Sequence, residues 1–392
     1  EVFPIFSSLP HEQQMKIFEG CGEGVRKVVL ATNIAETSLT INGIRYVIDC
    51  GLCKQRGFDP KTGIDSLLLT PISKAAARQR TGRAGREAPG LCYRLFPESA
   101  YHELYPSTVP EIQRCSLDHV VLQLKSIGVN DVLNFEYMSP PPTSALKTAL
   151  VRLYALGGLD RKGKITDPVG KSMAALPLLP MFSKTILEAA KLRVLPHVLR
   201  TVAMLAEDSS SVFFSNENEQ HKADAARMVF ASSSGDHITL LNVYTAYERE
   251  KSDVKGWCRH HFISQKALKH AREVFDQLVG YCEGMGMAVP DYKDKSEEDE
   301  EIIGQVKRSF AAGFYLQAAI KQPNGSFVTV NAPQTVHMHP SSVLFTKKPE
   351  CVLFTEVVLT TKLYMRDVLS IERTVLNECV PQFAASTLGD PL

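Results

Sequence analysis

Residues 26–41 read RKVVLATNIAETSLTI, which joins a short apolar, β-branched run to a series of small hydroxyl and amide side chains. A short apolar run with polar edges is typical of a buried strand in a parallel sheet. A second run of this kind, IRYVID, follows at residues 44–49. Because α/β proteins bind ligands at the carboxyl ends of parallel strands, the hydroxyl-rich stretch predicts contacts with phosphates or sugars. A capped loop that merely begins a helix is the alternative interpretation.

The motif QRTGRAGR at residues 79–86 ends an alanine-rich stretch that we expect to be a helix as far as about Gly85. On a helix, Gln79, Arg83 and Arg86 are spaced i, i+4 and i+7 and share one face. Two guanidinium groups and an amide on one face can bind a polyanion, since arginine is planar and permanently charged. The motif therefore indicates phosphate binding, and a solvated basic helix is the alternative.

Composition limits the class of protein. The 392 residues suggest two to four domains, and 44% hydrophobic with 22% charged residues is the balance of a folded protein. A net charge of +1 disfavours a nucleic-acid coat that is basic throughout and still allows a local basic groove. Nine scattered cysteines suit a reducing compartment. The sequence contains no run of 18 apolar residues, so it predicts no membrane-spanning helix. The start at Glu1, without methionine or a leader, suggests a part of a longer protein.

We predict no metal site. Cys50 and Cys53 form a C-x-x-C pair, but no second pair stands at zinc-binding spacing. The adjacent histidines at 260 and 261, and those at 337 and 339, also lack partners at metal-ligand spacing. Surface or packing roles are the simpler interpretation of these side chains.

Changes in pattern divide the chain into five parts. Two extended runs on either side of Pro60-Lys61-Thr62-Gly63 predict a β-hairpin in the first part. Two helical patterns and a short turn follow, which is the order of a winged helix. The expected parts are an α/β domain at 1–109, a winged helix at 110–174, a helical region at 175–290, an acidic linker at 291–304, and a small β-barrel or sandwich at 305–392.

The stretches at 31–41 and 79–86 together resemble motifs V and VI of the DEAH-box ATP-dependent RNA helicases. The likeness extends over essentially the whole chain, including PIFSSLP at 4–10, the hairpin segment at 58–75 and HPSSVLF at 339–345. The resemblance implies a multidomain α/β, α and β fold. Its parts would be the second RecA-like parallel-sheet domain, a winged helix, a helical ratchet-like bundle and a C-terminal OB-fold β-barrel.

The resemblance also implies roles for the residues of motif VI. In the family the glutamine and the second and third arginines of this motif reach the γ-phosphate, and these positions are Gln79, Arg83 and Arg86 here. Arg86 would act as the arginine finger. Such a residue typically contributes roughly 10³ to 10⁵ in rate, because it offsets charge that develops during phosphoryl transfer.

Five more residues match contact positions of the family. Phe18 matches the aromatic side chain that stacks on adenine, and Thr40 matches a nucleotide-contacting threonine. Asn42 stands where relatives often carry aspartate, and it can bond a ribose hydroxyl without contributing charge. Thr32 and Ser38 match positions that face the RNA backbone and relay its binding to the ATP site. Without the resemblance, a core role for Phe18 and a turn role for Thr40 would be the simpler interpretations.

Half of an ATP site is not found in the sequence. A P-loop requires G-x-x-x-x-G-K-[ST], and Gly170-Lys171-Ser172 lacks the first glycine, since Ile165 occupies that position. We interpret that segment as a turn and a helix start. No DEAH motif occurs either. We therefore expect the ligands for Mg²⁺ and the phosphate loop for ATP on a missing first RecA-like domain, and we expect this chain to be inactive alone.

Two functions of different class remain at this point. The first is the C-terminal portion of an ATP-dependent RNA helicase that translocates on or remodels single-stranded RNA. The second is a non-catalytic module that binds RNA or a partner. The resemblance implies a glycine-rich-patch protein as a candidate activator, and a nuclear location, with the nucleolus or the cytoplasm as alternatives.

Overall fold

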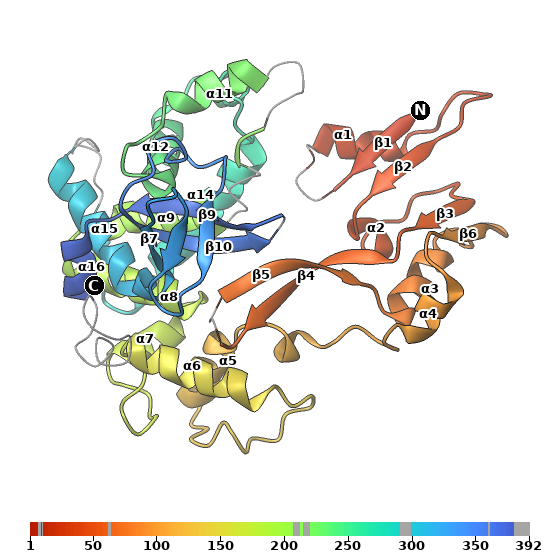
Figure 1. Ribbon diagram of the computed structural model, residues 1–392. Coiled ribbons are helices and arrows are strands. Elements are labelled where there is room, and N and C mark those ends of the chain that lie inside the picture. The colour runs from red at the N-terminus through yellow and green to blue at the C-terminus, as the bar shows by residue number, and fades with distance from the viewer. Residues whose placement is uncertain are drawn as a thin grey trace. The chain divides into compact units, whose positions relative to one another are not determined.

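The computed structural model describes residues 1–6, 9, 11–61, 64–206, 212–214, 220–290, 299–359 and 361–379 (Figure 1). The chain forms two compact units. The first comprises Glu1–Arg56 and Leu67–Glu111, and the second comprises Gly57–Ser66 and the residues from Ile112 onward. None of the helices in the described ranges combines the length and apolar character that a bilayer crossing requires.

The first unit contains two pairs of parallel strands, as the two apolar runs predict. β1 (Val2–Ile5) pairs with β2 (Val28–Ala31), and β3 (Tyr46–Asp49) pairs with β6 (Leu91–Arg94). Both are confirmed as parallel strands, although each is shorter than its apolar run. Their predicted burial is wrong, because Leu30 of β2 is 62% exposed and Ile48 of β3 is 70% exposed. The helical elements of this unit are α1 (His11–Met15), the 3₁₀ turn η1 (Lys16–Phe18), α2 (Ile34–Thr37), α3 (Lys74–Gly82) and α4 (Glu98–Glu103).

Helix α3 ends earlier than predicted. Its last helical residue is Gly82, and Arg83 forms the C-cap by donating its backbone N–H to the carbonyls of Arg80 and Thr81. Glycine loses more backbone freedom in a helix than other residues, so Gly82 and Gly85 weaken the helix at this point. Arg86 lies beyond the helix, and the prediction that it shares a helical face with Gln79 is therefore wrong.

The predicted hairpin is present as β4 (Leu52–Asp59) and β5 (Ile64–Pro71), and its tip belongs to the second unit. The backbone N–H of Phe58 donates to the carbonyl of Arg114 at 2.7 Å. The Thr148 hydroxyl donates to the carbonyl of Pro60 at 3.0 Å. Two hydrogen bonds thus attach the tip to segments that follow residue 111. Thr62 and Gly63 of the predicted turn lie outside the described residues.

The predicted winged-helix region begins with η2 (Glu111–Gln113), α5 (Asp118–Ser126) and α6 (Thr143–Ala155). A buried ion pair joins the two helices, with Arg152 Nε 3.0 Å from Asp118 Oδ2 and both side chains 5% exposed. An antiparallel bridge between Leu159 and Ile165 follows, and then α7 (Val169–Ala175). The Gly-Lys-Ser segment at 170–172 lies in α7, which confirms the helix start predicted there.

The helical region contains longer amphipathic helices. Helix α15 begins at Glu300, with Asp299 accepting a hydrogen bond from the Glu301 N–H as its N-cap. It therefore runs across the boundary predicted between residues 304 and 305. The helices are α8 (Pro180–Lys191), α9 (Leu195–Ala206), α11 (Gln220–Met228), α12 (Asp236–Arg249), α13 (Val254–His260), α14 (Gln265–Gly284) and α15 (Glu300–Phe314).

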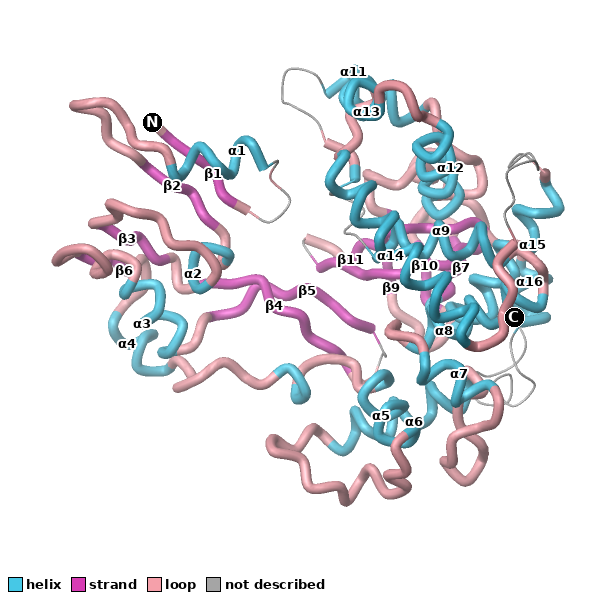
Figure 2. The backbone as a smooth tube through the Cα atoms, turned by 180° about the vertical axis from the view of Figure 1, so that it is seen from behind, coloured by secondary structure: helices cyan, strands magenta, loops and turns pink. Residues whose placement is uncertain are grey.

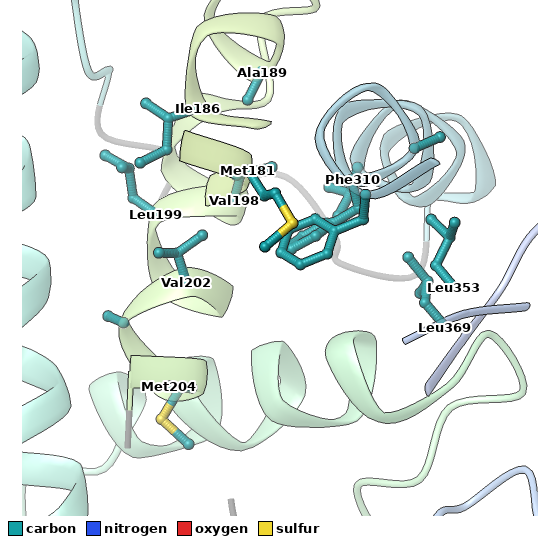
Figure 3. Packing of buried hydrophobic residues seen from close by; sticks show 14 of the residues in the cluster. Met181, Ile186, Ala189, Val198, Leu199, Val202, Met204, Phe310, Leu353 and Leu369 are labelled. Atoms are coloured by element: carbon teal, nitrogen blue, oxygen red, sulfur yellow. The ribbon is translucent and has the colours of Figure 1, made fainter. Parts of the chain in front are cut away.

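One hydrophobic core joins α8, α9, α12, α13, α14 and α15, and Figure 3 shows part of it from close by. Met181 of α8, Val198 and Val202 of α9, and Phe310 of α15 are at most 6% exposed. Leu353 comes from a strand that follows these helices in sequence and belongs to the same cluster. Full burial of such a side chain contributes about 1.5–3 kcal/mol, so the packing between helices and strands accounts for much of the stability of this unit.

The C-terminal part is a closed barrel of five strands, which confirms the predicted small β-barrel (Figure 2). Phe327, Val352 and Phe354 are among the side chains that fill its interior. Gly325 has a φ of +78°, which the Asn-Gly pair at 324–325 accommodates in a tight turn. The strands are β7 (Ala318–Lys321), β8 (Phe327–Thr329), β9 (Thr335–Met338), β10 (Cys351–Leu359) and β11 (Leu363–Ser370), and α16 (Arg373–Cys379) follows.

A buried carboxylate links the helical region to the barrel. Asp236, the first residue of α12, accepts hydrogen bonds from the Val343 N–H at 2.9 Å and from the Val368 N–H at 2.8 Å. Its side chain is almost completely buried, and this burial raises the pKa of the carboxyl group while the backbone donors lower it. Val368 lies in β11 and Val343 in the loop after β9, so one side chain holds two parts of the barrel.

Candidate functional site

Apolar side chains anchor the hydroxyl-rich loop that follows β2 to a small hydrophobic core. Ile34, Leu39 and Ile41 pack against a small core that contains Ile5 and Ile17. With these side chains packed against the core, the polar residues between them are left on the surface. Thr32, Ser38 and Thr40 are all exposed, as side chains that contact a ligand must be.

The two arginines that follow Arg80 in motif VI bind this loop. Arg83 Nη1 donates to the Leu39 carbonyl at 2.9 Å, and Arg83 Nη2 donates to the Glu36 carbonyl. Arg86 Nη1 donates to the hydroxyl of Thr40. The structure therefore brings together three of the predicted site residues, Arg83, Arg86 and Thr40, although Thr40 lies more than 40 positions before the two arginines in sequence.

Arg83 and Arg86 lack a carboxylate in ion-pair contact within the described part of the chain, although the nearby charge of Glu36 acts to raise the pKa of Arg83. Their acceptors are carbonyl and hydroxyl oxygens, and in the described ranges neither arginine forms an ion pair. Partial burial and the neighbouring charge of Arg86 lower the pKa of Arg83 from its ordinary value. Two adjacent cations without a carboxylate partner are suited to bind an anion such as phosphate.

The remaining predicted residues are exposed but not joined to this cluster. Gln79, Asn42 and Phe18 make no hydrogen bond or ion pair that links them to Arg83 or Arg86 within the described part of the chain. Phe18 is 45% exposed, whereas its neighbour Ile17 is completely buried. The core interpretation of Phe18 is therefore wrong, and its ring is accessible for stacking.

Sequence reasoning missed the role of Arg80, Glu36 and Asp49. Arg80 Nε lies 3.0 Å from Glu36 Oε2, and Arg80 Nη1 lies 2.8 Å from Asp49 Oδ1. The available signal was weak: a strand that ends in aspartate and a glutamate within an otherwise neutral loop. Nothing in their spacing predicts that one arginine pairs with both.

Metal ligation is not assigned to any of these residues. Among the side chains that the structure describes, no group of three His, Cys, Asp or Glu is placed to hold a metal ion. All nine cysteines are free thiols, including Cys50 and Cys53.

Comparison with known families places the chain among helicases. Residues 1–88 match the helicase conserved C-terminal domain, and 306–383 match an oligonucleotide/oligosaccharide-binding (OB) fold. Residues 149–178 and 179–240 match the winged-helix and ratchet-like parts of a helicase-associated domain. Together with the strand pairs, helices and barrel described above, these matches define the class: the C-terminal region of a helicase with a mixed multidomain fold.

Curated relatives narrow the class to a family. The chain is 43% identical over 383 residues to probable ATP-dependent RNA helicase DHX35 of Homo sapiens, covering 97% of this chain and 53% of that protein. It is 41% identical over 390 residues to pre-mRNA-splicing factor ATP-dependent RNA helicase DEAH10 of Arabidopsis thaliana, covering 96% and 53%. It is 42% identical over 384 residues to the splicing factor prp22 of Schizosaccharomyces pombe, covering 97% and 32%.

The chain belongs to the DEAH-box RNA helicases and corresponds to their C-terminal region. It spans about half the length of DHX35 and DEAH10.

Proposed function

We propose that this chain is the C-terminal portion of an ATP-dependent RNA helicase that couples ATP hydrolysis to movement along, or remodelling of, single-stranded RNA. The observation that carries the proposal is the placement of Arg83 and Arg86. Both are held by neutral oxygens of one loop, so both keep a charge that an anion can neutralise.

The two arginines complete an ATP site whose other half lies on a first RecA-like domain outside these 392 residues. ATP with Mg²⁺ supplies the phosphoryl group that is transferred to water. Arg86 offsets the charge that develops during this transfer, and Arg83 binds and orients the phosphate. Gln79, exposed on α3, contributes an amide that can contact the same phosphate. The ligands for Mg²⁺ belong to the first domain.

The base and sugar of the nucleotide have separate contacts. Phe18 presents an exposed ring on which adenine stacks. Asn42 bonds a ribose hydroxyl, and Thr40 contacts the nucleotide while its hydroxyl accepts a hydrogen bond from Arg86. A neutral amide at position 42 gives a weaker contact than the aspartate that relatives often carry there.

Thr32 and Ser38 bind the RNA backbone. Small hydroxyl groups on an exposed loop can bond phosphate oxygens without reading the bases, so this contact is independent of sequence. The hairpin β4–β5 grips the RNA strand and acts as a wedge, and movement is 3′ to 5′. A glycine-rich-patch protein is the activator we propose, and the splicing-factor names of two relatives support a nuclear location.

The experiment measures ATP hydrolysis by the complete protein with and without single-stranded RNA, at increasing salt. We expect RNA to stimulate hydrolysis, and we expect the RNA concentration for half-stimulation to rise with salt, since phosphate contacts dominate the affinity. A protein that binds RNA but hydrolyses ATP no faster in its presence would contradict the proposal. That result would favour the non-catalytic module.

A further inference from the structure

Arg80 contacts three separate segments of the first unit. Its Nε donates to Glu36 Oε2 at 3.0 Å, and its Nη1 donates to Asp49 Oδ1 at 2.8 Å. Its Nη2 donates to the carbonyl of Leu52 at 3.2 Å. Glu36 lies in α2 of the loop that carries Thr32 and Ser38, Asp49 ends β3, and Leu52 begins hairpin strand β4.

The three charged groups are largely removed from solvent. The side chain of Arg80 is 14% exposed, that of Glu36 is 16% exposed, and that of Asp49 is completely buried. Burial acts against the charge of Arg80, but the two carboxylates outweigh it and raise the pKa of the guanidinium group. Asp49 Oδ1 also accepts the Gly51 N–H at 2.9 Å, which fixes the turn between β3 and β4.

Arg80 is thus engaged differently from the other two arginines of the motif. Its ion pairs occupy the guanidinium group, whereas the acceptors of Arg83 and Arg86 among the described residues are neutral oxygens. A planar guanidinium group can satisfy several acceptors at once, which an ammonium group cannot do with the same geometry.

Glu36 takes part both in the ion pair with Arg80 and in the hydrogen bond from Arg83. Its carboxylate accepts from Arg80, and its backbone carbonyl accepts from Arg83. A displacement of Glu36 would therefore move the anchor of Arg83 as well. The loop that carries the RNA-facing hydroxyls and the arginine that faces the phosphate share this one residue.

We propose that Arg80 is a positioning residue: by holding Glu36 against α3, it transmits RNA binding at Thr32 and Ser38 to the orientation of Arg83. The inference rests on the proposed helicase function. Arg80 touches neither ATP nor RNA, and its role is in the dependence of hydrolysis on RNA rather than in the hydrolysis step.

The test compares variants of the complete protein. Arg80→Gln removes the charge, and Glu36→Gln keeps the shape and the carbonyl of residue 36 but removes the ion pair. Arg78→Gln is the matched control, since Arg78 is an exposed arginine of the same helix whose Nε bonds only the Lys74 carbonyl. The measurements are the rate of ATP hydrolysis without RNA, the rate at saturating RNA, the affinity for RNA, and the midpoint of thermal unfolding.

We expect Arg80→Gln and Glu36→Gln each to lower the ratio of RNA-stimulated to unstimulated hydrolysis about 5- to 30-fold, the size of a typical coupling between sites. The rate without RNA and the affinity for RNA should stay within about twofold, as should all values for Arg78→Gln. The double variant should be no worse than Arg80→Gln, because both changes break one interaction.

The outcomes separate this inference from the proposed function. A wild-type protein without RNA stimulation would contradict the proposed function itself. If stimulation is normal in the wild type and unchanged in Glu36→Gln, the inference is overturned. It is also overturned if the stimulated and unstimulated rates of Glu36→Gln fall in parallel, together with the unfolding midpoint, since that pattern describes a purely structural ion pair. Glu36→Gln decides the question where Arg80→Gln does not fold.

Discussion

We expect two buried histidines to make the second unit sensitive to acid. His237 is 1% exposed, and its ring packs edge-on against Phe310 with the ring centroids 4.6 Å apart. Burial lowers the pKa of His237 to about 3 and that of His197 to about 4. In the unfolded chain both rings return to a pKa near 6.5, so the unfolded state binds more protons as the pH falls.

The sign of the effect follows from these depressed values. The stability contribution of the neutral rings is fully present above about pH 6.5 and is lost as the pH falls from 6.5 toward 4 for His197 and toward 3 for His237. At pH 5 each histidine should lower the free energy of unfolding by about 2 kcal/mol relative to its value at pH 7.5. We expect His237→Phe to remove about half of the loss of stability that the two rings cause between pH 7.5 and pH 5. The measurement is the free energy of unfolding in urea at both pH values. Fluorescence of Trp257, the one tryptophan in the sequence, reports the transition.

The control for this prediction is His221→Phe, which changes a histidine that is exposed on α11. It should leave the difference in stability between pH 7.5 and pH 5 unchanged. Because the comparison is between two pH values, any packing cost of the new ring cancels. An unaltered pH difference in His237→Phe would show that the buried ring is not the source of the acid sensitivity.

At the scale of single residues, the sequence predicted the exposed cluster of Arg83, Arg86 and Thr40 better than the buried ion pairs of Arg80. Arg83, Arg86 and Thr40 carry recognisable motif positions, and the structure places them together. Arg80 and Asp49 were missed because an ion pair between residues 31 positions apart leaves no periodic signal in the chain. Their pairing is determined by how β3 and α3 pack, which is information of the tertiary structure.

At the scale of elements, Asp236 joins helix α12 to the barrel by accepting two backbone N–H groups. Asp236→Ala would leave both donors buried without an acceptor, which costs about 1–3 kcal/mol for each group. For the two groups together we expect a loss of about 2–6 kcal/mol in the free energy of unfolding, measured in urea.

A matched control is Asp253→Ala, which removes the exposed N-cap of α13 where Asp253 accepts the Gly256 N–H at 2.8 Å. Loss of such a cap costs about 1 kcal/mol. Equal losses in the two variants would contradict a special role for Asp236 in joining the helical region to the barrel.

The winged-helix elements offer a second test. Asp118→Asn removes the carboxylate that faces the buried guanidinium group of Arg152. Breaking a buried pair in this way costs about 3–5 kcal/mol. Lys171→Ala breaks an exposed pair with Asp167, in which both side chains are more than 60% exposed, and it should cost less than about 1 kcal/mol. Urea unfolding of both variants measures the two losses of stability. Similar losses would contradict the expectation that the buried ion pair matters more than the exposed one.

Helix ends and domain boundaries were the least predictable features. The alanine-rich run predicted α3 correctly but not its end at Gly82, because two glycines weaken the helix before the charge pattern changes. The acidic run was interpreted as a linker up to residue 304, yet α15 begins at Glu300. Acidic residues favour a helix N-terminus, so their presence there is consistent with either interpretation.

At the scale of the whole molecule, strand runs, helical periodicity and late alternation predicted an α/β part, a helical part and a barrel in the order observed. The tip of the hairpin is an exception. It is encoded within the first part of the chain, but Phe58 and Pro60 bond residues of the winged-helix region. Sequence patterns over a short stretch predict local structure. They do not predict that the hairpin tip attaches to residues far along the chain.

The proposed ATP site depends most on Arg83 and Arg86, which donate to carbonyl and hydroxyl oxygens and form no ion pair among the residues that the structure describes. The most direct measurement is the turnover number (kcat) and KM for ATP of the complete protein at saturating RNA, for Arg86→Ala beside the control Arg78→Ala. We predict that Arg86→Ala lowers kcat by about 10³-fold or more with little change in KM, because the residue acts mainly on charge that develops during the reaction. An Arg86→Ala variant that retains the wild-type kcat would contradict the account.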